Sequence, residues 1–209
     1  MSKGQKLLTI ALWGVFILTL NVVVFAFVLE RWHAPTVSNL PVLMNVPHFA
    51  LMDQDGKPVS DQDLHGKTWV AAFIFTGCAD TCPMMSKKME GLQNAIPAPG
   101  VNFVSFTVDP LRDTPAVLKT YAKRFNADPN RWRLLTGTPE QMKDVAYGMK
   151  IAVQPADGND PILHATYFLL VDSLGRVRGI YDTKDSTPAE KGVQQLARDA
   201  ADLAKSRPQ

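Results

Sequence analysis

The chain has 209 residues, 22 basic and 20 acidic side chains, and a formal net charge of +2 at neutral pH. This length allows one domain or one domain with an appendage, and a hydrophobic content of 46% excludes a disordered or collagen-like chain. The small net charge also excludes a nucleic-acid-binding protein, because such a protein needs a strong basic excess to neutralise phosphates.

The first 31 residues contain an uncharged apolar run. No charged side chain occurs over the 23 residues from Leu7 to Leu29. A run of that length predicts a transmembrane helix, whereas the apolar region of a cleaved signal peptide usually spans only about 7–15 residues. Lys3 and Lys6 precede the run, so the positive-inside rule predicts a cytoplasmic N-terminus.

We therefore predict a cytoplasmic tail at residues 1–6, a transmembrane anchor at 7–29, a linker at 30–44 and a folded domain at 45–209. Residues 1–31 hold three basic and one acidic side chain, so 19 of each sign remain in the rest. That neutral remainder is large enough to bury one core. We expect a single-pass protein of a bacterial inner (cytoplasmic) membrane, with its domain on the periplasmic, or extracytoplasmic, side.

The rest of the chain alternates predicted strands and helices. The continuous apolar run at 68–75 predicts a central buried strand. The other expected strands are 48–52, 101–108, 132–135, 165–171 and 176–181, the last two joined as a hairpin; the expected helices are 83–96, 115–125, one from 139, and 188–205. This order predicts an α/β domain with a mixed sheet covered by helices on both faces.

The two cysteines lie between the predicted central strand and the helix that follows it. Pro83 is expected at the first helical position, so Cys82 would lie at or beside the N-cap, where free N–H groups and the helix dipole favour a thiolate. The four-residue spacing lets the sulfurs of Cys78 and Cys82 share a metal ion or close a disulfide. A purely structural disulfide is disfavoured, because closing so short a loop contributes little stability.

A third ligand would separate metal binding from redox chemistry. His164 directly precedes the predicted strand 165–171, so we expect it at the mouth of the sheet, facing the cysteine loop. On spacing alone, a lone surface histidine is the competing interpretation. His33 adjoins the predicted anchor, and His48 and His65 are expected to be solvated.

With these residues in view, the chain resembles the Sco/SenC family of copper-binding cytochrome c oxidase assembly proteins over nearly all of residues 45–205. The resemblance is carried by a C-x3-C-P motif after a strand, by an Asp-Pro-x-Arg-Asp-Thr motif and by a distal histidine, in that order. The matching segments are 73–83, 107–115, 135–138 and 164–172. The chain departs from the usual family pattern at Gly77 and Ala79, which bears on loop rigidity and partner recognition.

The resemblance implies a thioredoxin-like fold with an N-terminal membrane anchor, and one copper ion bound by Cys78, Cys82 and His164. It also implies delivery of copper to the binuclear copper site of cytochrome c oxidase subunit II, or to another copper-accepting protein. Thiolates and imidazole favour Cu(I), whereas zinc prefers four ligands.

Three further questions stay open on the sequence. In the alternative function, a thiol–disulfide oxidoreductase reduces the cysteines of the target site, with Cys78 attacking and Cys82 resolving; peroxide reduction fits the motif less well. Asp109, Arg112 and Asp113 predict a charge network near the site, although Asp113 or Thr114 is equally placed to cap the next helix. Met84 and Met85 are expected to pack, with soft metal ligation as the less favoured role.

Overall fold

The computed structural model describes residues 3–32, 40–96, 100–151, 153–154, 162–163, 166–183 and 190–205. His33 and His164 lie outside these residues, whereas both cysteines lie within them. The chain divides into two compact units, residues 1–39 and residues 40–209.

The first unit contains one long helix, α1 (Lys3–Trp32). The side chains of residues 12–25 are exposed on it, and most of them are large and apolar. Among the residues that the structure describes, no helix is both long and apolar enough to cross a membrane. The tail, anchor and linker boundaries therefore stay predictions.

The second unit is built on an eight-stranded mixed sheet with the order β1-β10-β9-β4-β5-β6-β2-β3, and β7 and β8 form a separate two-stranded ribbon. The strands are β1 (Met44–Asn45), β2 (Ala50–Asp53), β3 (Pro58–Ser60), β4 (Thr68–Ile74), β5 (Val101–Thr107), β6 (Trp132–Thr136), β7 (Val153–Gln154), β8 (Ile162–Leu163), β9 (Tyr167–Val171) and β10 (Arg176–Asp182). The predicted mixed α/β sheet is confirmed.

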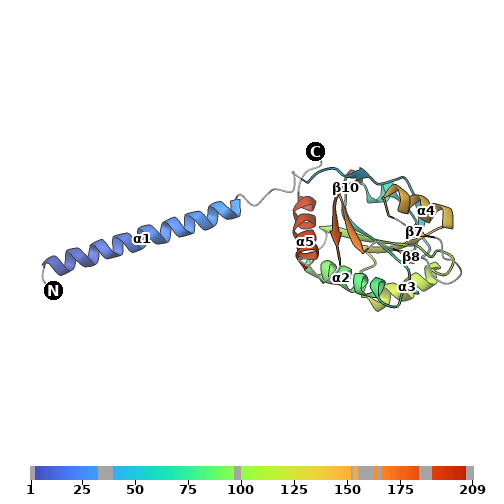
Figure 1. Ribbon diagram of the computed structural model, residues 1–209, viewed down its shortest axis with the longest axis horizontal. Coiled ribbons are helices and arrows are strands. Elements are labelled where there is room, and N and C mark those ends of the chain that lie inside the picture. The colour runs from blue at the N-terminus through green and yellow to red at the C-terminus, as the bar shows by residue number, and fades with distance from the viewer. Residues whose placement is uncertain are drawn as a thin grey trace. The chain divides into compact units, whose positions relative to one another are not determined.

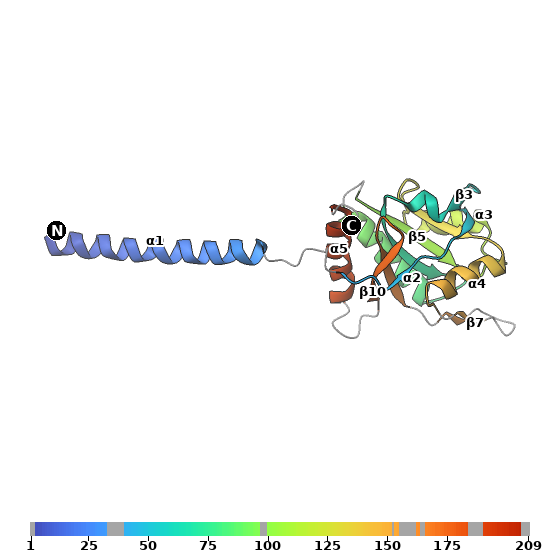
Figure 2. The same cartoon turned by 90° about the horizontal axis from the view of Figure 1, so that it is seen from above.

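The helices of this unit are the 3-10 turn η2 (Asp61–Leu64), α2 (Thr81–Ala95), α3 (Pro115–Arg124), α4 (Pro139–Gly148) and α5 (Glu190–Lys205). Helices α2 and α3 lie along one side of the sheet and α4 along the other (Figure 1). Helix α5 packs beside β10 and also contacts α2 and β4 (Figure 2). Helices therefore cover both faces of the sheet.

Strand β4 lies at the centre of the sheet, and all seven of its residues are buried. It pairs in parallel with β5 and antiparallel with β9, and Phe73 stacks on Phe106 with ring centroids 5.2 Å apart. Burial on both faces explains the uninterrupted apolar run in the sequence. Because β4, β5 and β6 are parallel, their C-terminal ends meet at one edge of the sheet, which we call the carboxyl edge.

The start of helix α2 differs from the prediction. The helix begins at Thr81 with Asp80 as its N-cap, so Cys82 is its second residue and Pro83 its third. The amides of the first helical turn have no intrahelical partner, and a proline is therefore tolerated there beyond the first position. The N-caps Thr114 and Thr138 each accept a backbone N–H, as their sequences indicate.

Candidate metal centre

Cys78 and Cys82 are held together where the chain leaves the carboxyl edge and enters α2. The backbone N–H of Cys82 donates to the Cys78 sulfur at 3.3 Å, and the Cys78 N–H donates to the Phe75 carbonyl. Both cysteines are free thiols, but Cys78 is half-buried whereas Cys82 is 1% exposed. One turn of chain thus presents two sulfurs, of which Cys78 is the more accessible.

The surroundings of Cys82 overturn part of the electrostatic prediction. Burial raises the pKa of the Cys82 thiol to about 12, and this effect outweighs the lowering by a hydrogen bond with the Phe75 backbone. The prediction that the helix N-terminus makes Cys82 acidic is therefore wrong, because loss of water around the sulfur dominates. At neutral pH, Cys82 is a protonated thiol that must lose its proton to bind a metal.

A pair of buried hydroxyls lies one helical turn beyond Cys82. Ser86 follows Cys82 by four residues on α2, and its Oγ lies 2.9 Å from the hydroxyl of Tyr121 on α3. Burial raises the pKa of Tyr121, so its hydroxyl stays neutral. This hydrogen bond joins the helix that carries Cys82 to the neighbouring helix. Met85, also on α2, is fully buried and packs in the core, as predicted.

Asp113 connects the thiol loop to the neighbouring strand. Its Oδ2 accepts the Thr76 backbone N–H at 3.1 Å, and its Oδ1 accepts the Thr76 hydroxyl at 2.5 Å. The Thr107 hydroxyl, at the end of β5, also donates to Oδ2. Asp113 therefore does not cap α3, and Thr114 does.

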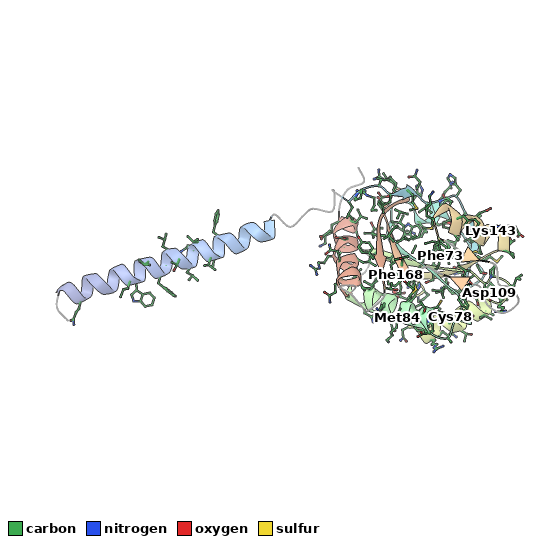
Figure 3. All side chains as sticks on the ribbon, viewed as in Figure 1. Phe73, Cys78, Met84, Asp109, Lys143 and Phe168 are labelled. Carbon is green, nitrogen blue, oxygen red and sulfur yellow. The ribbon has the colours of Figure 1, made fainter. Side chains whose placement is uncertain are left out.

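The predicted charge network is divided into two parts. Arg112 pairs with Asp109 at 3.2 Å near the surface, whereas Asp113 is completely buried. Cys78 and Asp109 both lie at the carboxyl edge, and Met84 lies nearby on α2 (Figure 3). The thiol loop is thus bordered by an exposed ion pair and supported by a buried carboxylate.

The predicted third ligand, His164, lies outside the described residues. Strand β9 is antiparallel to β4, with Leu169 opposite Ala71, so its first residue, Tyr167, lies toward the carboxyl edge. Within the part of the chain that the structure describes, no group of three or more His, Cys, Asp and Glu residues is arranged to hold a metal ion. The three-ligand centre therefore stays a prediction.

The two described histidines lie away from the thiols. His48 and His65 are exposed and line a cavity of about 330 Å³ beside Trp69, at the beginning of β4, whereas Cys78 follows the end of that strand. The His48 Nδ1 lies 2.8 Å from Asp61 Oδ2. The prediction that both histidines are solvated is confirmed.

Sequence reasoning assigned no role to three residues that support the thiol loop or the helix that carries Cys82. Thr76 and Thr107 each lie at the end of a buried parallel strand, where polar side chains meet at the carboxyl edge. A polar residue at the end of a predicted buried strand could therefore have identified both threonines from the sequence. Tyr121 sits at an ordinary core position of an amphipathic helix, and no pattern distinguishes it from a packing residue.

Comparison with known proteins identifies the family. The model of the SCO1/SenC family matches residues 42–200. The chain belongs to the SCO1/SenC family. A SCO1/SenC family lipoprotein from Bacillus anthracis is 35% identical, with a TM-score of 0.70 over 80% of this chain and 99% of that one. The likeness confirms the family's fold, a thioredoxin-like mixed sheet with helices, for the second unit.

Two further SCO1/SenC structures carry functional descriptions of their own. BsSco, described as a member of the Sco family of cytochrome c oxidase assembly proteins with a disulfide switch, is 32% identical, with a TM-score of 0.65 over 77% of this chain and 95% of that one. Bradyrhizobium japonicum ScoI, solved with copper bound, is 30% identical, with a TM-score of 0.62 over 74% of this chain and 98% of that one.

Proposed function

We propose that this SCO1/SenC protein binds copper and serves the assembly of cytochrome c oxidase. The observation that carries the proposal is the pairing of one buried and one half-buried thiol at the carboxyl edge. Support comes from the copper-bound ScoI structure and from the description of BsSco as an oxidase assembly protein. The copper-bound relative favours this function over thiol–disulfide exchange as the main activity.

The donor set fits Cu(I). Thiolates are soft ligands that select Cu(I), and a two- or three-coordinate ion does not require the four ligands that structural zinc prefers. Cys82 supplies a sheltered sulfur, and the half-buried Cys78 supplies one that another protein's ligand can approach. Loading of copper displaces the proton that burial holds on Cys82.

We assign the third ligand to His164. This histidine is three residues before Tyr167, and β9 begins toward the edge of the sheet that carries the thiol loop. Two thiolates, one neutral imidazole and Cu(I) carry a net charge of −1, which the adjoining N-terminus of α2 moderates. Ligand exchange between thiolates then passes the ion to the binuclear copper site of subunit II or to another copper-accepting protein.

The proposal includes membrane attachment through residues 7–29. Its support is the uncharged run in the sequence and the exposed apolar side chains on α1, such as Leu18 at 65% and Val23 at 64% exposure. The related Bacillus anthracis protein is described as a lipoprotein. A tether would hold the copper-binding domain beside an oxidase subunit in the same membrane.

Competitive titration of the reduced full-length chain with a Cu(I) chelator tests the proposal. We expect one Cu(I) per chain, and we expect Cys78→Ser and Cys82→Ser each to weaken the affinity by about 100-fold or more, because serine is a poor ligand for Cu(I). Ser86→Ala is the matched control, since it alters α2 one turn away without removing a sulfur. Unchanged affinity in both cysteine variants would reject copper binding at this pair.

A further inference from the structure

Asp113 is a buried carboxylate that is held by hydroxyl and amide donors. It is 0% exposed, and no basic side chain in the described ranges forms an ion pair with it. Its partners are instead the amide and hydroxyl of Thr76 and the hydroxyl of Thr107. Burying a charge is costly unless hydrogen bonds compensate for the lost water, so this carboxylate depends on all of these donors.

The donors come from the two central strands at the point where the thiol loop begins. Thr76 lies two residues before Cys78, and both its backbone N–H and its side chain are bound by the carboxylate. Thr107 is the last residue of β5, and the Asp113 N–H donates to the Asp109 carbonyl at 2.9 Å. The carboxylate thus fastens the first residues of the thiol loop to the end of β5 and the start of α3.

We propose that Asp113 is a positioning residue that keeps the sulfur of Cys78 close to the sulfur of Cys82. The copper part of this inference rests on the proposed function, whereas the redox part rests only on the two thiols. A carboxylate is suited to the role because it is an acceptor only, and all three groups that face it donate. An asparagine would turn an NH₂ group toward at least one of these donors.

The test compares Asp113→Asn and Asp113→Ala with the wild-type full-length chain. The matched control is Asp172→Asn, which changes another buried carboxylate, 3% exposed, that accepts backbone N–H groups from Leu174 and Arg176. Asp172 follows β9 at the end of the sheet opposite the thiols, since Val171 pairs with Trp69. Thermal unfolding, the midpoint potential of the Cys78–Cys82 couple and the Cu(I) affinity are measured for each.

Without the Asp113 carboxylate, the loop that carries Cys78 is held less firmly. The effective concentration of the Cys78 thiol near Cys82 then falls. We therefore expect both Asp113 variants to weaken Cu(I) binding by about tenfold or more, as is typical of groups that orient a ligand. We also expect the couple to move to a more positive potential by about 30 mV, the equivalent of a tenfold change in its equilibrium constant. Asp172→Asn should lower the unfolding temperature and leave both properties of the thiols unchanged.

Thr76→Val provides a second route if Asp113→Ala does not fold. It removes one hydroxyl donor and keeps the carboxylate, and we expect smaller shifts in the same directions. Wild-type potential and affinity in folded Asp113→Asn or Thr76→Val would overturn the proposal, as would equal shifts in Asp172→Asn. If the wild-type chain takes up no copper but the potentials still shift, the proposed function fails and the positioning role stands.

Discussion

Cys78 and Cys82 belong to one motif, but the fold gives them different environments. Cys82 is 1% exposed, and burial holds its proton, whereas Cys78 is half-buried on the outer side of the loop. A protein that releases a metal to another protein needs one ligand that can be approached and one that retains the ion during exchange. The asymmetry of the pair suits that division of roles.

The role of a third residue, His164, as a copper ligand is tested by the variant His164→Ala. We expect the variant to bind Cu(I) at least about tenfold more weakly and to retain its disulfide exchange, because both sulfurs remain and one donor is lost. Chelator competition measures the affinity, and equilibration with dithiothreitol measures the thiol couple. His48→Ala is the control, since that side chain is 94% exposed and lies beyond the opposite end of β4. Wild-type copper affinity in His164→Ala would contradict the three-ligand centre.

Among the elements, the turn between β9 and β10 gives a prediction of pH dependence. Asp172 accepts hydrogen bonds from the backbone of Arg176 and Leu174 and pairs with the side chains of Arg176 and Arg178. Burial raises the pKa of Asp172, but these hydrogen bonds outweigh it, and the pKa lies below its ordinary value of 3.8. The Arg178 side chain also donates to the Leu40 carbonyl, so this cluster joins the start of the domain to the hairpin.

Because the pKa is depressed in the folded state, the ionised Asp172 stabilises the fold above about pH 3.8 and loses this contribution as the pH falls through the folded-state pKa. We expect Asp172→Asn to lower the free energy of unfolding at pH 7, and the deficit relative to the wild type to shrink below pH 4. Urea unfolding at a series of pH values measures both. Asp202→Asn, on the exposed side of α5, is the control. A deficit that does not depend on pH would show that the charge contributes nothing.

For the whole molecule, the main prediction concerns the apolar N-terminal segment. The full chain should remain in the membrane fraction after an alkaline carbonate wash, and a chain without residues 7–29 should not, because the length of the uncharged run in the sequence predicts a membrane anchor. Protease added to spheroplasts should digest the domain, since Lys3 and Lys6 predict a cytoplasmic N-terminus under the positive-inside rule. Release of the intact full chain by carbonate, or a domain protected from protease, would contradict the single-pass topology.

The sequence by itself determined the central strand, the position of the cysteine pair after it, the hairpin at Asp172 and the α/β class. Each depends on neighbouring residues, such as the unbroken apolar run of β4 or the turn residues that end in Gly175, whose φ is +74°. The short strands β1 and β3 were not expected, because two or three residues carry too little periodicity to be distinguished from a loop.

Only the tertiary structure decided the chemistry around the thiols. The helix dipole is a local property that the sequence suggests, but the burial of Cys82 depends on the helices and strands that surround it, and burial is the larger effect on its pKa. Asp113 likewise looked like a helix cap beside Thr114, and its partner Thr76 lies 37 residues earlier in the chain. Such contacts arise when β4 and β5 align in the sheet, so residue spacing alone could not supply them.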